Sequence, residues 1–291
     1  MTPVAAGDCR ITREAVPRVR TKGNRDLVDF LRHGYRRCMA KIRAAPLLGD
    51  GIRQLSPREQ RSVAALFAML LRVRAAAHSA FPEQLRLQML ECIRGYVWGH
   101  RFPPQDAVGA AFVDTCQRYG VPTGVFDRII NGYTAEVAFD GHLIDDWEHL
   151  EWHCRSIAGV FGEAVLPVVG VAEVDDELIE AVHLVAVGMH ITDLLDHVEE
   201  DWLCGRVYLP VEVLQRHQID EHTGGPAELP CPWHNAIREV ALMADTLLDE
   251  TTTLVRRLPR RAGACASSWA EVHRARLRRI TSGSNLRKSA S

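Results

Sequence analysis

The sequence predicts an all-α protein, a single-domain helical bundle with a central cavity. Apolar residues recur at helical spacing through almost every segment between residues 25 and 281, and strand-like alternation is nowhere sustained. With 291 residues, 47% of them hydrophobic, the chain can bury a large core. Long helices packed around such a core leave a ligand site between their facing side chains.

The first two expected helices have the clearest signals. Between residues 26 and 45, Leu27 and Leu31 fall on one face with other apolar residues. The run Ser56-Pro57-Arg58-Glu59 combines an N-cap, a proline at the first helical position and a glutamate at the third. It therefore predicts a helix start for the apolar segment 61–79.

Prolines and glycines delimit the remaining helices. Phe81-Pro82 ends the second helix, and a third runs to about residue 99. Later breaks are expected at Gly120, Gly141, Gly170 and 223–226. The later helices are expected over 105–119, 122–137, 145–166, 175–203, 231–258 and 264–280.

We expect one helical domain over 25–281, with a mobile leader (1–24) before it and a disordered tail (282–291) after it. The net charge of −2 gives no reason to expect nucleic acid as a partner. The eight cysteines form no C-x-x-C pair and the N-terminus lacks a secretory signal, which predicts free thiols and a cytoplasmic protein. The most apolar run, 157–172, is too short to cross a bilayer, so no membrane span is expected.

The stretch VGMHITDLLDHVEEDWLCGRVYLP (187–210) gathers carboxylates on neighbouring helical turns, where like charges repel. At helical spacing, His190, Asp193, His197 and Asp201 form one stripe that faces a single cavity. Carboxylates of this kind suit Mg²⁺, which usually keeps substrate phosphates among its other ligands. Composition alone leaves a solvated acidic face as the alternative.

A transition-metal site is a further alternative for the same stripe. His183 precedes His190 by about two turns, so with Asp193 and His197 the helix offers nitrogen and oxygen ligands of the kind that zinc or iron takes. His149 and His153 add an i, i+4 pair on another helix. The chain contains no H-E-x-x-H motif, and single histidines on amphipathic helices are usually hydrogen-bonded core or surface groups.

Within the acidic stretch, Glu200-Asp201 is followed by Gly205-Arg206 and then by Tyr208-Leu209-Pro210. Three further segments are LSPREQRSVAALFA (55–68), CRSIAGVFG (154–162) and LPRRA (258–262). In this order the four segments resemble the squalene/phytoene synthase family, the head-to-head isoprenoid synthases, over about residues 25–281. The resemblance implies an all-α isoprenoid synthase fold that binds allylic diphosphates through Mg²⁺ held by two facing acidic motifs.

Both acidic motifs depart from the family pattern. Where the family has D-D-x-x-D, the chain reads Arg74-Ala75-Ala76-Ala77-His78. In the second motif the family's Asn, Asp and Asp correspond to Asp193, His197 and Asp201, and Glu200 keeps the acidic neighbour. We therefore predict Asp193, Glu200 and Asp201 as the Mg²⁺ ligands. Loss of the first motif argues against squalene or phytoene synthesis, which must neutralise two diphosphate leaving groups.

Arginine is itself a bidentate partner of phosphate. Arg53, Arg72 and Arg74 are accordingly predicted to bind one diphosphate, although ordinary surface charge is an equal alternative for Arg72 and Arg74. By the family resemblance, Arg206 and Tyr208 add phosphate contacts.

The function predicted from these departures is prenyl transfer from one small allylic diphosphate, dimethylallyl first, to an aromatic small molecule such as a carbazole, in secondary metabolism. His78, His190 and His197 are the candidate bases that take up the ring proton. A pseudoenzyme that serves as an assembly or interaction factor and a terpene cyclase are the alternatives. A cyclase would form its product from the diphosphate alone.

Overall fold

The computed structural model describes residues 23–45, 47–100, 102–138, 144–220, 225–227 and 230–282. The structure is 78% helical and its described residues contain no β-strand, so the all-α prediction is confirmed. The predicted leader and tail lie outside this part of the chain, apart from residues 23, 24 and 282. The α-helices are α1 (Gly23–Ala44), α2 (Pro57–Ala77), α3 (Glu83–Gly99), α4 (Ala107–Tyr119), α5 (Thr123–Ala138), α6 (Trp147–Cys154), α7 (Val160–Val165), α8 (Asp176–Asp196), α9 (Val198–Leu203), α10 (Val211–Arg216), α11 (Pro230–Leu248), α12 (Thr251–Arg257) and α13 (Arg260–Thr281).

Three of the expected helices are interrupted. The helix expected over 145–166 becomes α6 and α7, joined by a π-helical turn, η2 (Arg155–Gly159). The helix expected over 175–203 ends at Asp196, and α9 begins after His197. The helix expected over 231–258 divides into α11 and α12, and the short α10 was not predicted. Helical periodicity continues through such breaks, which is why the pattern did not reveal them.

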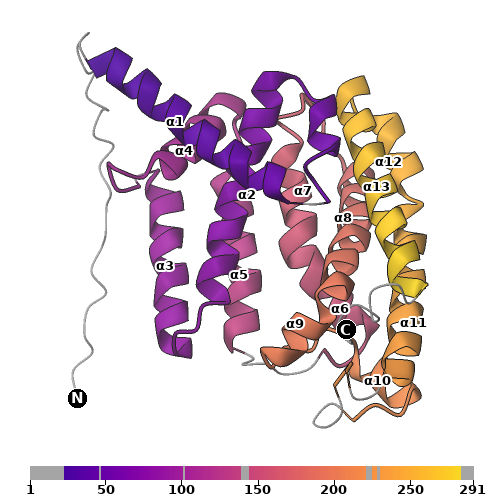
Figure 1. The fold of residues 1–291 in the computed structure, drawn as a ribbon. Coiled ribbons are helices and arrows are strands. Elements are labelled where there is room, and N and C mark those ends of the chain that lie inside the picture. The colour runs from indigo at the N-terminus through magenta and orange to yellow at the C-terminus, as the bar shows by residue number, and fades with distance from the viewer. Residues whose placement is uncertain are drawn as a thin grey trace, which may run out of the picture.

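The long helices stand side by side as a bundle, with α1 slanting across one end (Figure 1). From left to right in the view, the helices are α3, α2, α5, α7 and α8, followed by α13 and α11 (Figure 1). The π-helical turn η2 packs against both α5 and α8 and so joins the two halves. α2, α5 and α8 all end at the pole of the bundle where α6, α9 and α10 lie, and this pole carries the polar residues described below (Figure 1).

The start of α2 is the one that the sequence predicted. The Ser56 side chain accepts a hydrogen bond from the Glu59 amide, and the Glu59 carboxylate accepts one from the Ser56 amide at 2.6 Å. Pro57 occupies the first helical position, where no amide hydrogen is needed. This capping box directs α2 into the centre of the molecule.

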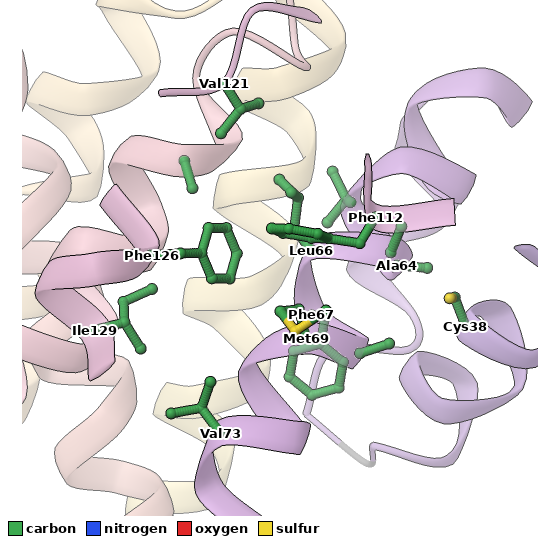
Figure 2. Packing of buried hydrophobic residues seen from close by; sticks show 14 of the residues in the cluster. Cys38, Ala64, Leu66, Phe67, Met69, Val73, Phe112, Val121, Phe126 and Ile129 are labelled. Atoms are coloured by element: carbon green, nitrogen blue, oxygen red, sulfur yellow. The ribbon is translucent and has the colours of Figure 1, made fainter. Parts of the chain in front are cut away.

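The N-terminal half of the core forms between α2, α4 and α5. Figure 2 shows Leu66 and Val73 of α2 beside Phe126 of α5 and Phe112 of α4. The rings of Phe112 and Phe126 meet edge to face, with centroids 4.7 Å apart. A second cluster, centred on α8 and α11, contains the fully buried Trp233. The core therefore holds both sides of the bundle around the space between α2 and α8.

Among the described residues, one helix, α8, is long and apolar enough to span a membrane. It packs against α7, α11 and α13, and nine of its residues are buried. Its composition is accordingly that of a central helix in a bundle.

Replacing Gly34 by alanine is expected to destabilise the protein. A Cβ at Gly34 would lie 1.9 Å from the carbonyl oxygen of Ala107, because α1 and α4 are in contact there. Overpacking of this kind costs about 1–3 kcal/mol. Gly95→Ala is the matched control, since a Cβ there meets nothing within 4 Å, and it should stabilise α3 by about 0.5–1 kcal/mol. Urea unfolding of both variants measures the difference, and equal effects would contradict this account of the α1–α4 contact.

Candidate active site

An apolar cavity of about 580 Å³, called here the main cavity, lies between the helices of the bundle. Its wall comes chiefly from α1, α2, α7, α8 and α13, and Phe67 and Phe161 meet there with ring centroids 6.3 Å apart. Most of the polar side chains in its lining lie at the pole where α2, α5 and α8 end. They are Arg74, Tyr133, His190, Asp193, His197 and His273, and Lys41 of α1 lines the cavity separately.

A second cavity, of about 470 Å³, lies at the same pole. Residues from the end of α2, from α5, from α6 and from the segment after α9 line it. Its aromatic wall includes Phe81 and Trp152. The titratable side chains that line it are His78, Arg86, Glu136, His149, His153, Cys204, Arg206 and Tyr208.

A layer of rings separates the two cavities. His190 of the main cavity stacks on His153 of the second, with centroids 6.1 Å apart, and His153 in turn stacks on Tyr208 at 5.5 Å. Tyr133 of the main cavity and His78 of the second meet edge to face at 5.9 Å. A group that leaves one cavity therefore needs to pass only one layer of side chains to reach the other.

The two stacked histidines are neutral at pH 7. Burial lowers the pKa of His153, and burial together with the neighbouring His153 lowers the pKa of His190 to about 4. A neutral imidazole is able to accept a proton, so His190 is chemically suited to act as a base at the polar end of the main cavity.

Glu136 of α5 links three parts of this pole. Its Oε1 lies 2.6 Å from Nε2 of His78 and accepts a hydrogen bond from the Tyr208 hydroxyl at 2.7 Å. Burial alone would raise the pKa of Glu136, but the hydrogen bonds from His78 and Tyr208 and the charge of nearby histidines lower it to about 2. Glu136 is therefore an ionised carboxylate that ties α2 to the chain after α9.

Arg74 and Asp193 face each other across the polar end of the main cavity. The shortest distance between the guanidinium and the carboxylate is 3.9 Å, and each side chain is 37% exposed. The first-motif position of α2 thus contributes a cation that lies opposite the acidic stripe of α8.

The helix break at His197 separates the carboxylates that the sequence places on one stripe. Asp201 is buried and accepts two hydrogen bonds from Arg206, at 2.8 Å and 3.1 Å, while Glu200 is exposed. Asp193 stays on α8 beside the main cavity. One continuous helix would have kept the spacing of four residues on a single face.

This arrangement does not fit the Mg²⁺ site predicted from Asp193, Glu200 and Asp201. Mg²⁺ takes carboxylate oxygens in near-octahedral geometry, yet Asp201 is engaged by Arg206 and Asp193 faces Arg74. Within the described part of the chain, no three His, Cys, Asp or Glu side chains come together as a metal-binding group. The zinc or iron alternative has no such group either, and His183 lies against Glu163, at 2.7 Å.

Two of the predicted arginines lie outside both cavities. Arg53 is 77% exposed beside Asp50. Arg72 makes two hydrogen bonds to Asp106, of 2.5 Å and 2.9 Å, and lies over the Phe102 ring. The remaining predicted residues, His78, His190, His197, Arg74, Arg206 and Tyr208, line one cavity or the other.

Glu136 and Tyr133 were missed in the sequence, and His153 was considered only as a possible metal ligand. Tyr133 and Glu136 are three residues apart on α5, a spacing that places both on one face of the helix, but no motif marks them. His153 belongs to the pair His149 and His153, whose spacing shows only that the two lie on one face of α6. Their roles depend on partners that are distant in the sequence.

The chain belongs to the squalene/phytoene synthase family, because the sequence model of that family matches residues 50–288. It is 27% identical to the phytoene synthase of Mycobacterium tuberculosis over 231 residues, which cover 78% of this chain and 74% of that protein. Phytoene synthase 1 of Arabidopsis thaliana is also 27% identical, over 57% of this chain and 39% of that protein. The family consists of prenyl-transferring enzymes that bind allylic diphosphates.

Solved structures show the same fold. The squalene synthase HpnC of Alicyclobacillus acidocaldarius superposes with a TM-score of 0.73 at 18% identity and covers 88% of this chain and 95% of its own. A dehydrosqualene synthase superposes with a TM-score of 0.74 at 19% identity, over 91% of this chain and 94% of its own. The isoprenoid synthase fold expected from the sequence is therefore confirmed.

The low pKa of Glu136 predicts how stability depends on pH. A carboxyl whose pKa falls from 4.5 to about 2 on folding stabilises the native state above pH 4.5, and this stabilisation is lost as the pH falls toward 2. Glu136→Gln should therefore reduce the free energy of unfolding at pH 7 by on the order of 3 kcal/mol, a difference that shrinks toward pH 3. Urea unfolding across this pH range tests it. Glu271→Gln, at an exposed position of α13, is the control, and a pH-independent difference would contradict the assignment.

Proposed function

We propose that the chain is a prenyltransferase that ionises one small allylic diphosphate and transfers the prenyl group to an aromatic small molecule. The observation that carries this proposal is the apolar main cavity, whose polar end presents Arg74 at a position where the family pattern has an aspartate. A guanidinium forms two parallel hydrogen bonds with a phosphate. One diphosphate is thereby accommodated, and the wall opposite remains available for a different second substrate.

The size of the main cavity supports a short donor, with dimethylallyl diphosphate as the first choice. A five-carbon group fills only part of about 580 Å³. The remaining volume, between apolar and aromatic side chains such as Phe67 and Phe161, accepts a flat ring system, for example a carbazole. We place such an enzyme in the cytoplasm and in secondary metabolism.

Fixed positive charge beside the departing diphosphate lowers the barrier to ionisation, especially where water is excluded. Arg74 supplies this charge from the main cavity. Arg206 supports it from the second cavity, since Asp201 occupies its Nε and Nη2 and leaves Nη1 to offer. The Tyr208 hydroxyl is directed to Glu136, so Tyr208 positions the wall between the cavities.

Proton removal from the aromatic ring completes the transfer. The allylic C–O bond breaks first and diphosphate leaves with its electron pair. The allylic carbocation then bonds to a ring carbon, and that carbon loses its proton to a base. His190 is neutral and lines the main cavity, which makes it the first choice. His78 is the second, because it lines the second cavity with its Nε2 2.6 Å from the Glu136 carboxylate. His197 is the third: it also lines the main cavity, and the bond from its Nδ1 to the Asp193 carbonyl oxygen, at 2.8 Å, leaves Nε2 as the acceptor.

A pseudoenzyme that acts as an assembly or interaction factor is the second candidate. The observation in its favour is that the carboxylates at this pole are already paired with cations of the same chain. A terpene cyclase shares the ionisation step and differs in needing no acceptor.

Arg74→Ala is expected to lower the rate of prenyl transfer by about 10²–10³-fold, the usual cost of removing one preorganised charge-stabilising group. The assay follows product mass after incubation with dimethylallyl, geranyl or farnesyl diphosphate and a panel of aromatic acceptors. Arg36→Ala, at an exposed position of α1, is the matched control and should leave the rate unchanged.

The same assay separates the candidate functions. A prenylated acceptor formed by the wild type supports the proposal. A hydrocarbon or alcohol formed from the diphosphate alone indicates a cyclase. No turnover of any donor with any acceptor would overturn the proposal and favour the pseudoenzyme.

A further inference from the structure

We infer that this chain binds the diphosphate group of its substrate through its own cationic side chains and requires no divalent metal ion for that binding. The inference rests on the proposed function and concerns how the same site neutralises the substrate. Its basis is the pairing of charges at the pole where α2, α5 and α8 end.

Each carboxylate that lines or supports the two cavities has a cationic or hydrogen-bonding partner within the chain. Arg74 faces Asp193 at 3.9 Å, His78 contacts Glu136 at 2.6 Å, and Arg206 contacts Asp201 at 2.8 Å. A fourth ion pair joins Arg276 of α13 to Asp196 of α8. Since a hard cation is held mainly by carboxylate oxygens, a magnesium ion would have to displace these partners.

Positions 74 and 78, where the family has aspartates, supply the positive charge that a metal ion would otherwise bring. A D-D-x-x-D motif would point carboxylates from α2 toward those of α8, and such facing acids need cations between them. Here α2 offers Arg74 and His78 instead, opposite Asp193 and Glu136. An arginine stays charged at any physiological pH, so the charge that a metal ion would bring is part of the chain. A divalent ion next to Arg74 would be repelled.

The pairs differ in how readily they exchange partners. Asp201 is buried and its contact with Arg206 is short, so this pair holds the segment after α9 in place. Arg74 and Asp193 are 3.9 Å apart and more than a third exposed at the cavity, which makes theirs the looser pair. A diphosphate that enters the polar end can replace Asp193 as the partner of Arg74.

Asp193 does not become an isolated charge when Arg74 turns to the substrate. Arg276 and His273 of α13 lie near enough for their titration to depend on its charge. The exchange therefore converts a weak internal ion pair into a bidentate guanidinium–phosphate contact. Arg276 remains near enough to interact with the Asp193 carboxylate.

The test is calorimetric titration of the purified full-length protein with dimethylallyl diphosphate and, separately, with inorganic diphosphate, in excess EDTA and in MgCl₂. We expect the dissociation constants in the two media to agree within about threefold. Arg74→Ala should weaken binding in EDTA by at least about tenfold, as for loss of a charged hydrogen-bonding partner. Arg36→Ala should bind like the wild type. Circular dichroism confirms folding, and Arg74→Gln replaces Arg74→Ala if that variant does not fold.

A double variant that should gain dependence on Mg²⁺ provides a second test. Arg74→Asp combined with His78→Asp returns carboxylates to α2, and its diphosphate binding should be lost in EDTA and regained only with Mg²⁺. If that variant binds equally well in EDTA, charge at these positions does not decide metal dependence, and the inference fails.

The same titration distinguishes failure of metal-independent binding from failure of the proposed prenyl transfer. Binding by the wild type only in MgCl₂ overturns the metal-independent site and leaves prenyl transfer standing. Absence of binding to either diphosphate in both media overturns the proposed function and, with it, this inference.

Discussion

The hydrogen-bonded group around Glu136 is the constraint on which the candidate site depends. A buried carboxylate is tolerable only when partners compensate its charge, and here His78 of α2 and Tyr208 of the segment after α9 do so. Because the three residues come from distant parts of the chain, satisfying one charge also closes one pole of the bundle. The ring layer that separates the two cavities is built on the same residues, His78 and Tyr208, together with His153, His190 and Tyr133.

The pairing of charges at this pole also gives the site its chemical character. A cavity lined by uncompensated carboxylates attracts metal ions, whereas a cavity whose acids are already paired offers arginine and histidine side chains to an anion. Membership of the squalene/phytoene synthase family is consistent with an apolar space between the helices. The replacement at positions 74 and 78 explains why this member is expected to treat a diphosphate differently.

Much of the fold could be predicted, because helical periodicity and caps are local properties. The Ser56–Glu59 capping box is one example, and the helices that begin near residues 105 and 122 are others. The interruptions at η2 and His197 could not be predicted, since no proline marks either of them. Both breaks face the cavities: η2 packs between α5 and α8, and His197 lies at the polar end of the main cavity. Packing against neighbouring helices evidently outweighs local periodicity there.

The sequence by itself determined the helical class, the family and the substitution of Arg74 and His78 for a pair of motif acids, because each of these depends on residues read in order. Only the tertiary structure decided which charges meet. The acids of 193–201 form a stripe on an ideal helix, but the break at His197 sends Asp201 to Arg206 and leaves Asp193 to Arg74. Glu136, unmarked in the sequence, becomes central because burial makes its partners indispensable. Electrostatic energy depends on distance and burial, and both exist only once the chain is folded.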